Sequence, residues 1–281
     1  MIGFKSKKSK KRSRNRKMGV RRKYIRYTIF GFVCYAIFLV TTFPASILVS
    51  FVKASPQLNR QIQITAVDGT LWNGSAANVR VSGVNLGQLK WDMKILPMLL
   101  GKIKLHINFN DKAVSSLTTS GSGYVSVSLG GRLTIEDFRA TVSADTLAPL
   151  MYGMPARFGG DVNLLIQEMT VIQGKRINMK SRVVVSKARL VSPQKITYGD
   201  ILIQVTPKDN GSQFVLSDQG GPLILDGVIK VKGNGIYTVN LGLGARSTAS
   251  ADLENGLRFI GGRRDSNGKY RYKSNGKLKN W

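Results

Sequence analysis

The sequence predicts a mainly β protein, with a single N-terminal transmembrane helix followed by an antiparallel β-meander domain. Three observations support this fold class. A long uncharged stretch runs from Tyr27 to Val52, apolar and polar residues alternate from Ile62 onward, and Gly, Asn, Asp and Ser dipeptides separate the alternating runs. The meander is expected to form an extended or curved sheet with a few short helices.

Residues 27–52 contain no acidic or basic side chain. At about 1.5 Å of rise per residue, a helix of this length crosses the roughly 30 Å hydrocarbon core of a bilayer. Residues 1–26 contain 13 Lys and Arg, and the first acidic residue is Asp68. This asymmetry predicts a basic cytoplasmic arm over 1–26 and export of everything after the helix to the periplasm. Anionic membrane lipids are the expected partner of the arm.

The apolar stretch has three other interpretations. A signal peptide cleaved before Ser55 has suitable residues at Val52 and Ala54, but its apolar region is usually about 7–15 residues long. A buried core helix would carry a polar stripe, which this run lacks. A nucleic-acid-binding arm would leave the apolar run unexplained, so no nucleic acid is expected. A chain that begins at Met18 would still have a basic flank followed by the whole apolar stretch, so either Met1 or Met18 is the native start.

The formal net charge of the chain is +28, and the part after residue 26 retains +15 of it. Cys34, the only cysteine, lies inside the predicted helix. The exported part is therefore expected to have no disulfide and no cysteine-ligated metal.

Residues 53–61 are expected to be a linker, and residues 62–281 a periplasmic β domain with two candidate halves, 62–160 and 161–281. Alternating apolar residues predict strands at Ile62, Ile64 and Ala66 and at Ala77, Val79, Val81 and Leu86. Further alternating runs predict strands at Ile103–Phe109, Tyr124–Leu129, Leu133–Ile135, Val162–Ile166, Ile177–Val185, Ile201–Val205, Phe214–Leu216, Leu223–Val231 and Tyr237–Leu243. The dipeptides expected to mark turns are Asp68-Gly69, Asn73-Gly74, Ser82-Gly83, Asn210-Gly211, Asp226-Gly227, Asn234-Gly235 and Asn267-Gly268.

Two segments are predicted to be short helices, Ala144–Gly153 and Ser250–Gly261. The sequence Ser-Ala-Asp marks the start of both, at Ser143–Asp145 and Ser250–Asp252, and both follow Gly-rich strands. A duplicated unit explains this pattern, and chance similarity between two meanders explains it equally well.

The sequence contains few residues in patterns typical of catalytic, cofactor or metal sites. His106, the only histidine, falls opposite Ile103 and Ile107 in an alternating run, where a surface position is expected. Glu136 and Asp137 are adjacent, so a strand would point them to opposite faces, and they are turn residues if the strand ends at Ile135. Neither arrangement pairs the two carboxylates for acid and base chemistry. No P-loop, HExxH, EF-hand or G-x-S-x-G spacing is present, and Gly121-Ser122-Gly123 opens a strand rather than a helix. We therefore expect no catalytic residues, no cofactor and no metal site.

The run Val67 to Ala76 reads V-D-G-T-L-W-N-G-S-A, with Trp72 between two turn glycines. Trp72 is expected either to fill one end of the core or to contact a partner. This run resembles protein N of the bacterial type II secretion pathway. The resemblance continues through Gly87–Trp91, Leu99–Ile103, Gln219–Gly227, Gly235–Tyr237, Ala245-Arg246, Leu257–Gly261, Asn267–Tyr270 and Asn275–Leu278. The chain departs from that family in its longer basic arm, its heavier basic tail and Val185, where tryptophan is common.

The resemblance implies a non-enzymatic, bitopic accessory component of the type II secretion machinery in the inner membrane. Other subunits in the periplasm and inner membrane would be its partners, reached by docking of a sheet edge and basic faces. A solvated basic surface is the competing interpretation of those charges. Candidate contact residues are Trp72, Arg258, Arg263, Arg264, Lys269, Arg271 and Lys273. The alternative function is an anchored periplasmic protein that carries or contacts lipid in a β-groove.

Overall fold

The computed structural model describes residues 27–35, 38–39, 41–111, 119–151, 153, 155–172, 176–208, 210–261 and 264–278. The chain divides into two compact units, residues 1–44 and 45–281. In the first unit, residues 27–35, 38, 39 and 41 are helical, whereas the predicted cytoplasmic arm lies outside the described residues. Within the described part, no helix combines the length and apolar character that crossing a membrane requires. The transmembrane helix over 27–52 therefore stays a prediction.

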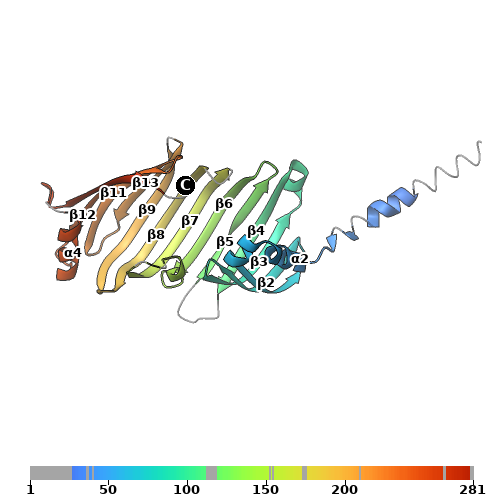
Figure 1. The fold of residues 1–281 in the computed structure, drawn as a ribbon, viewed down its shortest axis with the longest axis horizontal. Helices are drawn as coiled ribbons and strands as arrows, with labels where there is room; N and C mark the ends of the chain where they lie inside the picture. Colours follow the sequence, from blue (N-terminus) through green and yellow to red (C-terminus); the bar gives the residue numbers. More distant parts are fainter. Residues whose placement is uncertain are drawn as a thin grey trace, which may run out of the picture. The chain divides into compact units, whose positions relative to one another are not determined.

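The second unit is built on one antiparallel sheet of thirteen strands, each paired with its neighbours in sequence. Figure 1 shows these strands side by side, from β2 in cyan to β12 in orange. The strands are β1 (Ile62–Gly69), β2 (Asn73–Val81), β3 (Val84–Lys94), β4 (Lys102–Asp111), β5 (Thr119–Ser128), β6 (Arg132–Ser143), β7 (Arg157–Ile172), β8 (Arg176–Ser192), β9 (Ile196–Lys208), β10 (Gly211–Asp218), β11 (Leu223–Lys232), β12 (Ile236–Ala245) and β13 (Tyr270–Lys277). The predicted antiparallel meander is confirmed.

The helices of this unit are short. They are α2 (Ser46–Ala54), α3 (Pro56–Gln61) and α4 (Ala251–Gly261), with 3-10 helices η1 (Leu96–Leu100) and η2 (Ala148–Met151). The helix predicted over 250–261 is confirmed as α4. The one predicted over 144–153 is wrong in type and length, because η2 is the only helix among the described residues of that segment. Pro149 lies within that segment, and a proline inside a helix removes a backbone donor.

Several predicted turns are confirmed. Ser82 and Gly83 connect β2 to β3 with φ angles of 51° and 85°, a pair of positive values that suits a tight hairpin. Asp226-Gly227 was predicted as a turn but lies within β11. A Cβ atom at Gly227 would lie 2.5 Å from Cδ2 of Leu241 on β12. This glycine therefore allows a close approach between strands and does not reverse the chain.

The pairing register divides the sheet into an apolar face and a polar face. One row of directly paired residues crosses all thirteen strands and defines the apolar face: Val67, Ala76, Leu89, Phe109, Gly121, Ala140, Leu164, Val183, Ile203, Leu216, Gly227, Leu241 and Tyr272. The adjacent row defines the polar face: Asp68, Ser75, Lys90, Asn108, Ser122, Arg139, Leu165, Arg182, Gln204, Val215, Val228, Asn240 and Lys273. Side chains alternate between faces at every residue of a strand, so the sequence pattern creates this division.

Two buried clusters lie at opposite ends of the strand order. At the N-terminal end, Ala45 is buried against Ala76, Val79 and Trp91, and its N–H donates to the carbonyl of Gly69 at 3.1 Å. At the C-terminal end, α4 packs mainly against β9, β12 and β13. Each cluster buries apolar side chains near one end of the strand order, and the C-terminal one lies beside most of the predicted contact residues.

Candidate docking surface at the C-terminal end of the sheet

Helix α4 begins at a side-chain cap, because the N–H of Leu253 donates to Oγ of Ser250 at 3.3 Å. Leu253 and Leu257, four residues apart, are 2% and 4% exposed and pack in a cluster with Leu223 and Tyr270. Burial of this face fixes the orientation of the helix on the sheet.

The side of α4 away from the cluster carries Arg258 and Phe259. Phe259 is 96% exposed, and Arg258 is also exposed, with no ion pair in the part of the chain that the structure describes. An aromatic ring and a guanidinium are the side chains that most often dominate binding energy at protein interfaces. Their placement on a firmly packed helix creates a candidate contact site.

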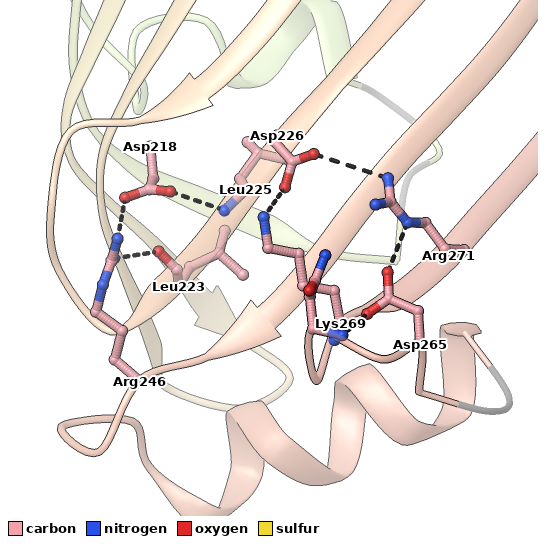
Figure 2. Close-up of polar contacts among 9 residues, drawn as sticks. Asp218, Leu223, Leu225, Asp226, Arg246, Asp265, Lys269 and Arg271 are labelled. Carbon is pink, nitrogen blue, oxygen red and sulfur yellow. Dashed lines mark hydrogen bonds and ion pairs between the residues drawn. The ribbon is translucent and has the colours of Figure 1, made fainter.

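Arg246 ties the loop between β10 and β11 to the end of β12 (Figure 2). Its guanidinium donates to the carbonyls of Gly221 at 2.8 Å and Leu223 at 2.9 Å, and to Oδ1 of Asp218 at 2.6 Å. The other carboxylate oxygen of Asp218 accepts the N–H of Leu225 at 3.0 Å. One charge pair thus holds three segments of backbone together.

The Asp218 carboxyl feels opposing influences on its pKa. Burial raises the pKa, but the hydrogen bonds from Leu225, Arg246 and Gly220 and the Arg246 charge together outweigh burial and lower it. The carboxylate is therefore favoured in its charged form, which is the form that pairs with Arg246.

A second network joins β11, β13 and the loop before β13 (Figure 2). Lys269 forms an ion pair with Asp226, and Arg271 lies 2.8 Å from Oδ2 of Asp265 and 3.8 Å from Oδ2 of Asp226. The hydrogen bond from the N–H of Lys269, followed by the one from Arg271, holds the pKa of Asp265 below its usual value. This network fixes the hairpin that leads into β13.

Arg264 completes the hairpin. Its Nε donates to the hydroxyl of Tyr270 at 3.0 Å, and its guanidinium carbon lies 5.2 Å from the centre of that ring. Arg264 and Tyr270 also form an antiparallel bridge, so residue 264 lies beside the beginning of β13.

The structure thus brings together most of the predicted contact residues. Lys269 and Arg271 are paired with carboxylates and Arg264 with Tyr270, whereas Arg258 and Lys273 are exposed without an ion pair among the described residues. Arg263 lies outside the described residues. Arg264, Lys269 and Arg271 therefore stabilise the hairpin before β13, whereas Arg258 and Lys273 face solvent.

Trp72 lies apart from this group, in the loop between β1 and β2 at the other end of the strand order. It is half-buried, and its carbonyl accepts the N–H of Met93 at 2.6 Å. The aromatic that fills the core there is Trp91, which is 7% exposed and donates its indole N–H to the carbonyl of Leu71 at 3.2 Å. A Cβ at Gly74 would lie 2.4 Å from Cζ2 of Trp91, so the glycine makes room for this ring.

His106 and Glu136 each contact another side chain of the sheet. His106 lies against Tyr124 with ring centres 4.8 Å apart, and Glu136 forms an ion pair with Lys104. Asp137 has a φ of 49° next to a register shift between β5 and β6, which places it at a bulge. The described residues contain no group of three or more His, Cys, Asp or Glu placed to hold a metal ion.

Sequence reasoning missed Asp218, Asp226, Asp265 and the exposed Phe259 as parts of this end of the sheet. The available signals were the runs Gln219–Gly227 and Ala245-Arg246. Their role becomes clear only when Arg246 is seen bonded to the β10–β11 loop.

The fold and this surface define a one-layer antiparallel β protein with a helix-capped, ion-paired C-terminal end. The model of the type II secretion system protein N family matches residues 60–273, and the chain belongs to that family. A similar protein is the type II secretion system protein N of Vibrio cholerae serotype O1 (strain ATCC 39315 / El Tor Inaba N16961), 30% identical over 140 residues. The alignment covers 48% of this chain and 55% of that protein, so the chain spans about half the length of the curated relative. No solved structure matches the chain.

Proposed function

We propose that this chain is a non-enzymatic accessory component of the type II secretion machinery that acts by docking to other subunits. The proposal places it in the inner membrane as a single-pass protein, with its N-terminus cytoplasmic and its β domain periplasmic. Family membership supports the secretion role. The uncharged stretch at 27–52 and its basic flank support the topology.

The observation that carries the docking role is the outward side of α4. Phe259 is almost fully exposed beside Arg258, although two buried leucines hold the helix in place. Exposing an aromatic side chain this fully forgoes the burial that stabilises a fold, and a partner surface would recover it. The adjacent guanidinium selects an acidic partner surface, because opposite charges favour encounter and correct orientation.

Affinity purification from membranes of cells that carry the secretion machinery tests this role. The full chain should co-purify with other secretion subunits, and the double variant Phe259→Ala, Arg258→Glu should lose most of them. Asn255→Ala is the matched control, because Asn255 is an exposed residue of the same helix. Equal recovery of subunits with the wild type, the double variant and the control would contradict docking through α4.

A second candidate function is contact with lipid acyl chains. It is favoured by the apolar row that crosses all thirteen strands, because the helices pack mainly near the two ends of the strand order. Acyl chains need no hydrogen-bond partners, and an apolar sheet face offers none. Mass spectrometry of lipid extracted from the purified full chain tests this function. Bound lipid that is lost in Leu164→Asp, at the middle of the apolar row, would support it, and the absence of lipid from the wild type would contradict it.

A further inference from the structure

The last strand of the sheet presents a defined set of backbone groups to solvent. The N–H of Leu278 donates to the carbonyl of Gly235 at 2.9 Å, which continues the register that pairs Lys277 with Ile236. In an antiparallel pair, residues whose N–H and C=O point toward the partner strand alternate with residues whose groups point away. Leu278 points toward β12, so the backbone groups of Arg271, Lys273, Asn275 and Lys277 point away from it.

The open part of this edge begins after the first residues of β13. Arg264 bridges Tyr270 and occupies the beginning of the strand. Beyond that bridge, β13 is the final strand in the sheet order, and the described residues provide no further strand beside it. Lys273, Asn275 and Lys277 therefore present outward N–H and C=O groups that a further strand could pair with.

The charge of this edge indicates the kind of strand it would accept. The side chains of Lys273 and Lys277 lie on the polar face, are exposed and have no ion pair in the described part of the chain. Arg271, in contrast, is already neutralised by Asp265 and Asp226. A neighbouring strand with acidic side chains on the same face would place opposite charges across from each other, which stabilises a strand pair.

The same charges disfavour a second copy of this edge. Antiparallel pairing of β13 with β13 would bring Lys and Arg side chains of both copies together, and like charges directly opposite each other are destabilising. The edge at β1 differs, since its only charged residue is Asp68 and its Ala66 has a positive φ of 49°. An irregular backbone on an edge strand hinders continuous pairing.

We propose that β13 accepts an extended strand from a partner protein, paired to the backbone of Lys273–Lys277, with Asp or Glu at alternate positions facing the lysines. This inference rests on the proposed docking function and identifies the partner as a β-strand with an acidic face. Main-chain hydrogen bonds supply affinity in such strand addition, and alternate side chains supply specificity.

The test uses the detergent-solubilised full chain and a short, dye-labelled peptide in which Asp alternates with Val. Fluorescence anisotropy should show binding that weakens with salt, whereas peptides with Lys or Asn in place of Asp should bind much more weakly. Asn275→Pro should weaken binding of the acidic peptide about tenfold or more, because it removes an outward N–H and leaves a peptide carbonyl unpaired. Asn275→Ala is the matched control and should bind as the wild type does.

Asn275→Pro is expected to fold, because the N–H that it removes points away from β12, and edge strands accept proline at such positions. An unchanged thermal unfolding temperature, together with unchanged protection of the α4 amides from hydrogen exchange, would establish that Asn275→Pro folds. Should Asn275→Pro unfold, a peptide N-methylated at alternate residues makes the same test from the ligand side, and it must lose binding to the wild type.

Equal binding of the acidic peptide to Asn275→Pro and wild type would overturn strand addition, since attraction to lysine alone would then explain the affinity. Self-association of the wild type that Asn275→Pro abolishes would also overturn the inference, because the occupant would be a second copy. In cells, equal co-purification of secretion subunits with the wild type and with Asn275→Pro would refute strand addition at β13 and leave the proposed docking function intact. Failure of the wild type to co-purify with any subunit would instead refute docking.

Discussion

Arg246 should contribute more to stability than any exposed ion pair among the described residues. The substitution Arg246→Met keeps an unbranched stem comparable to the apolar part of the arginine side chain and removes the hydrogen-bond donors. Two carbonyls and the Asp218 carboxylate then lose a charged partner. The Asp218 side chain is 13% exposed, so little water can replace the guanidinium there.

The magnitude follows from those contacts. A hydrogen bond to a charged group contributes about 1.5–3 kcal/mol when it is buried. The Arg246 side chain is 39% exposed, which weakens each contact through solvent screening. Asp218 also keeps the N–H groups of Leu225 and Gly220 as partners. We therefore expect Arg246→Met to lower the free energy of unfolding by about 2–4 kcal/mol.

The control is Arg157→Met. Arg157 pairs with Asp145 at 3.5 Å, but its side chain is 68% exposed, and such pairs contribute about 0–1 kcal/mol. Denaturant unfolding of the full chain in detergent measures both variants, and amide exchange in residues 219–225 reports the local effect. Equal losses in the two variants would refute the claim that Arg246 organises this end of the sheet.

Three further predictions concern the folded domain. Leu253→Ala should lower the free energy of unfolding by about 2–5 kcal/mol through the cavity it creates, and it should raise the rate of amide exchange in α4. Unchanged exchange in α4 would contradict the packing of Leu253 against Leu223 and Tyr270. Gly74→Ala should destabilise by about 1–3 kcal/mol and shift tryptophan fluorescence, because the new Cβ meets the Trp91 ring, whereas Gly256→Ala on α4 has open space and serves as the control. Folding lowers the pKa of Asp218 from its ordinary value of 3.8, so its stabilising contribution is present above that pH and is lost as the pH falls through the pKa of the folded state. The free energy of unfolding should therefore fall less steeply with acid in Asp218→Asn than in the wild type. Identical curves of unfolding free energy against pH would contradict this.

Alternation was sufficient to predict most strands, because each strand has one apolar and one polar face. Strand β13 was missed, since Tyr270–Lys277 has apolar character only at its two tyrosines. Its extended conformation depends on pairing with β12, a contact that the local pattern does not contain. The turn predicted at Asp226-Gly227 failed for a related reason, because glycine also serves where strands approach closely.

The candidate site could be predicted only in part. The basic residues near the C-terminus were visible in the sequence, but the carboxylates that neutralise some of them were not assigned to them. Asp226 precedes Lys269 by 43 residues, and the pairing of β11, β12 and β13 brings the two together. Likewise, the sequence offers Trp72 as a core or contact aromatic. Packing over Gly74 shows that Trp91 is the core aromatic, and the contact role of Trp72 stays a prediction.

Photo-cross-linking in intact cells tests the docking function most directly. A photoreactive amino acid placed at Phe259 of the full chain should form cross-links to other subunits of the secretion machinery. The same group at Gln204, an exposed residue of β9 on the polar face, should form few. Cross-links to secretion subunits from position 259 and not from position 204 are the predicted result. Cross-links only to lipid, or none from position 259 in cells that secrete normally, would contradict docking through α4.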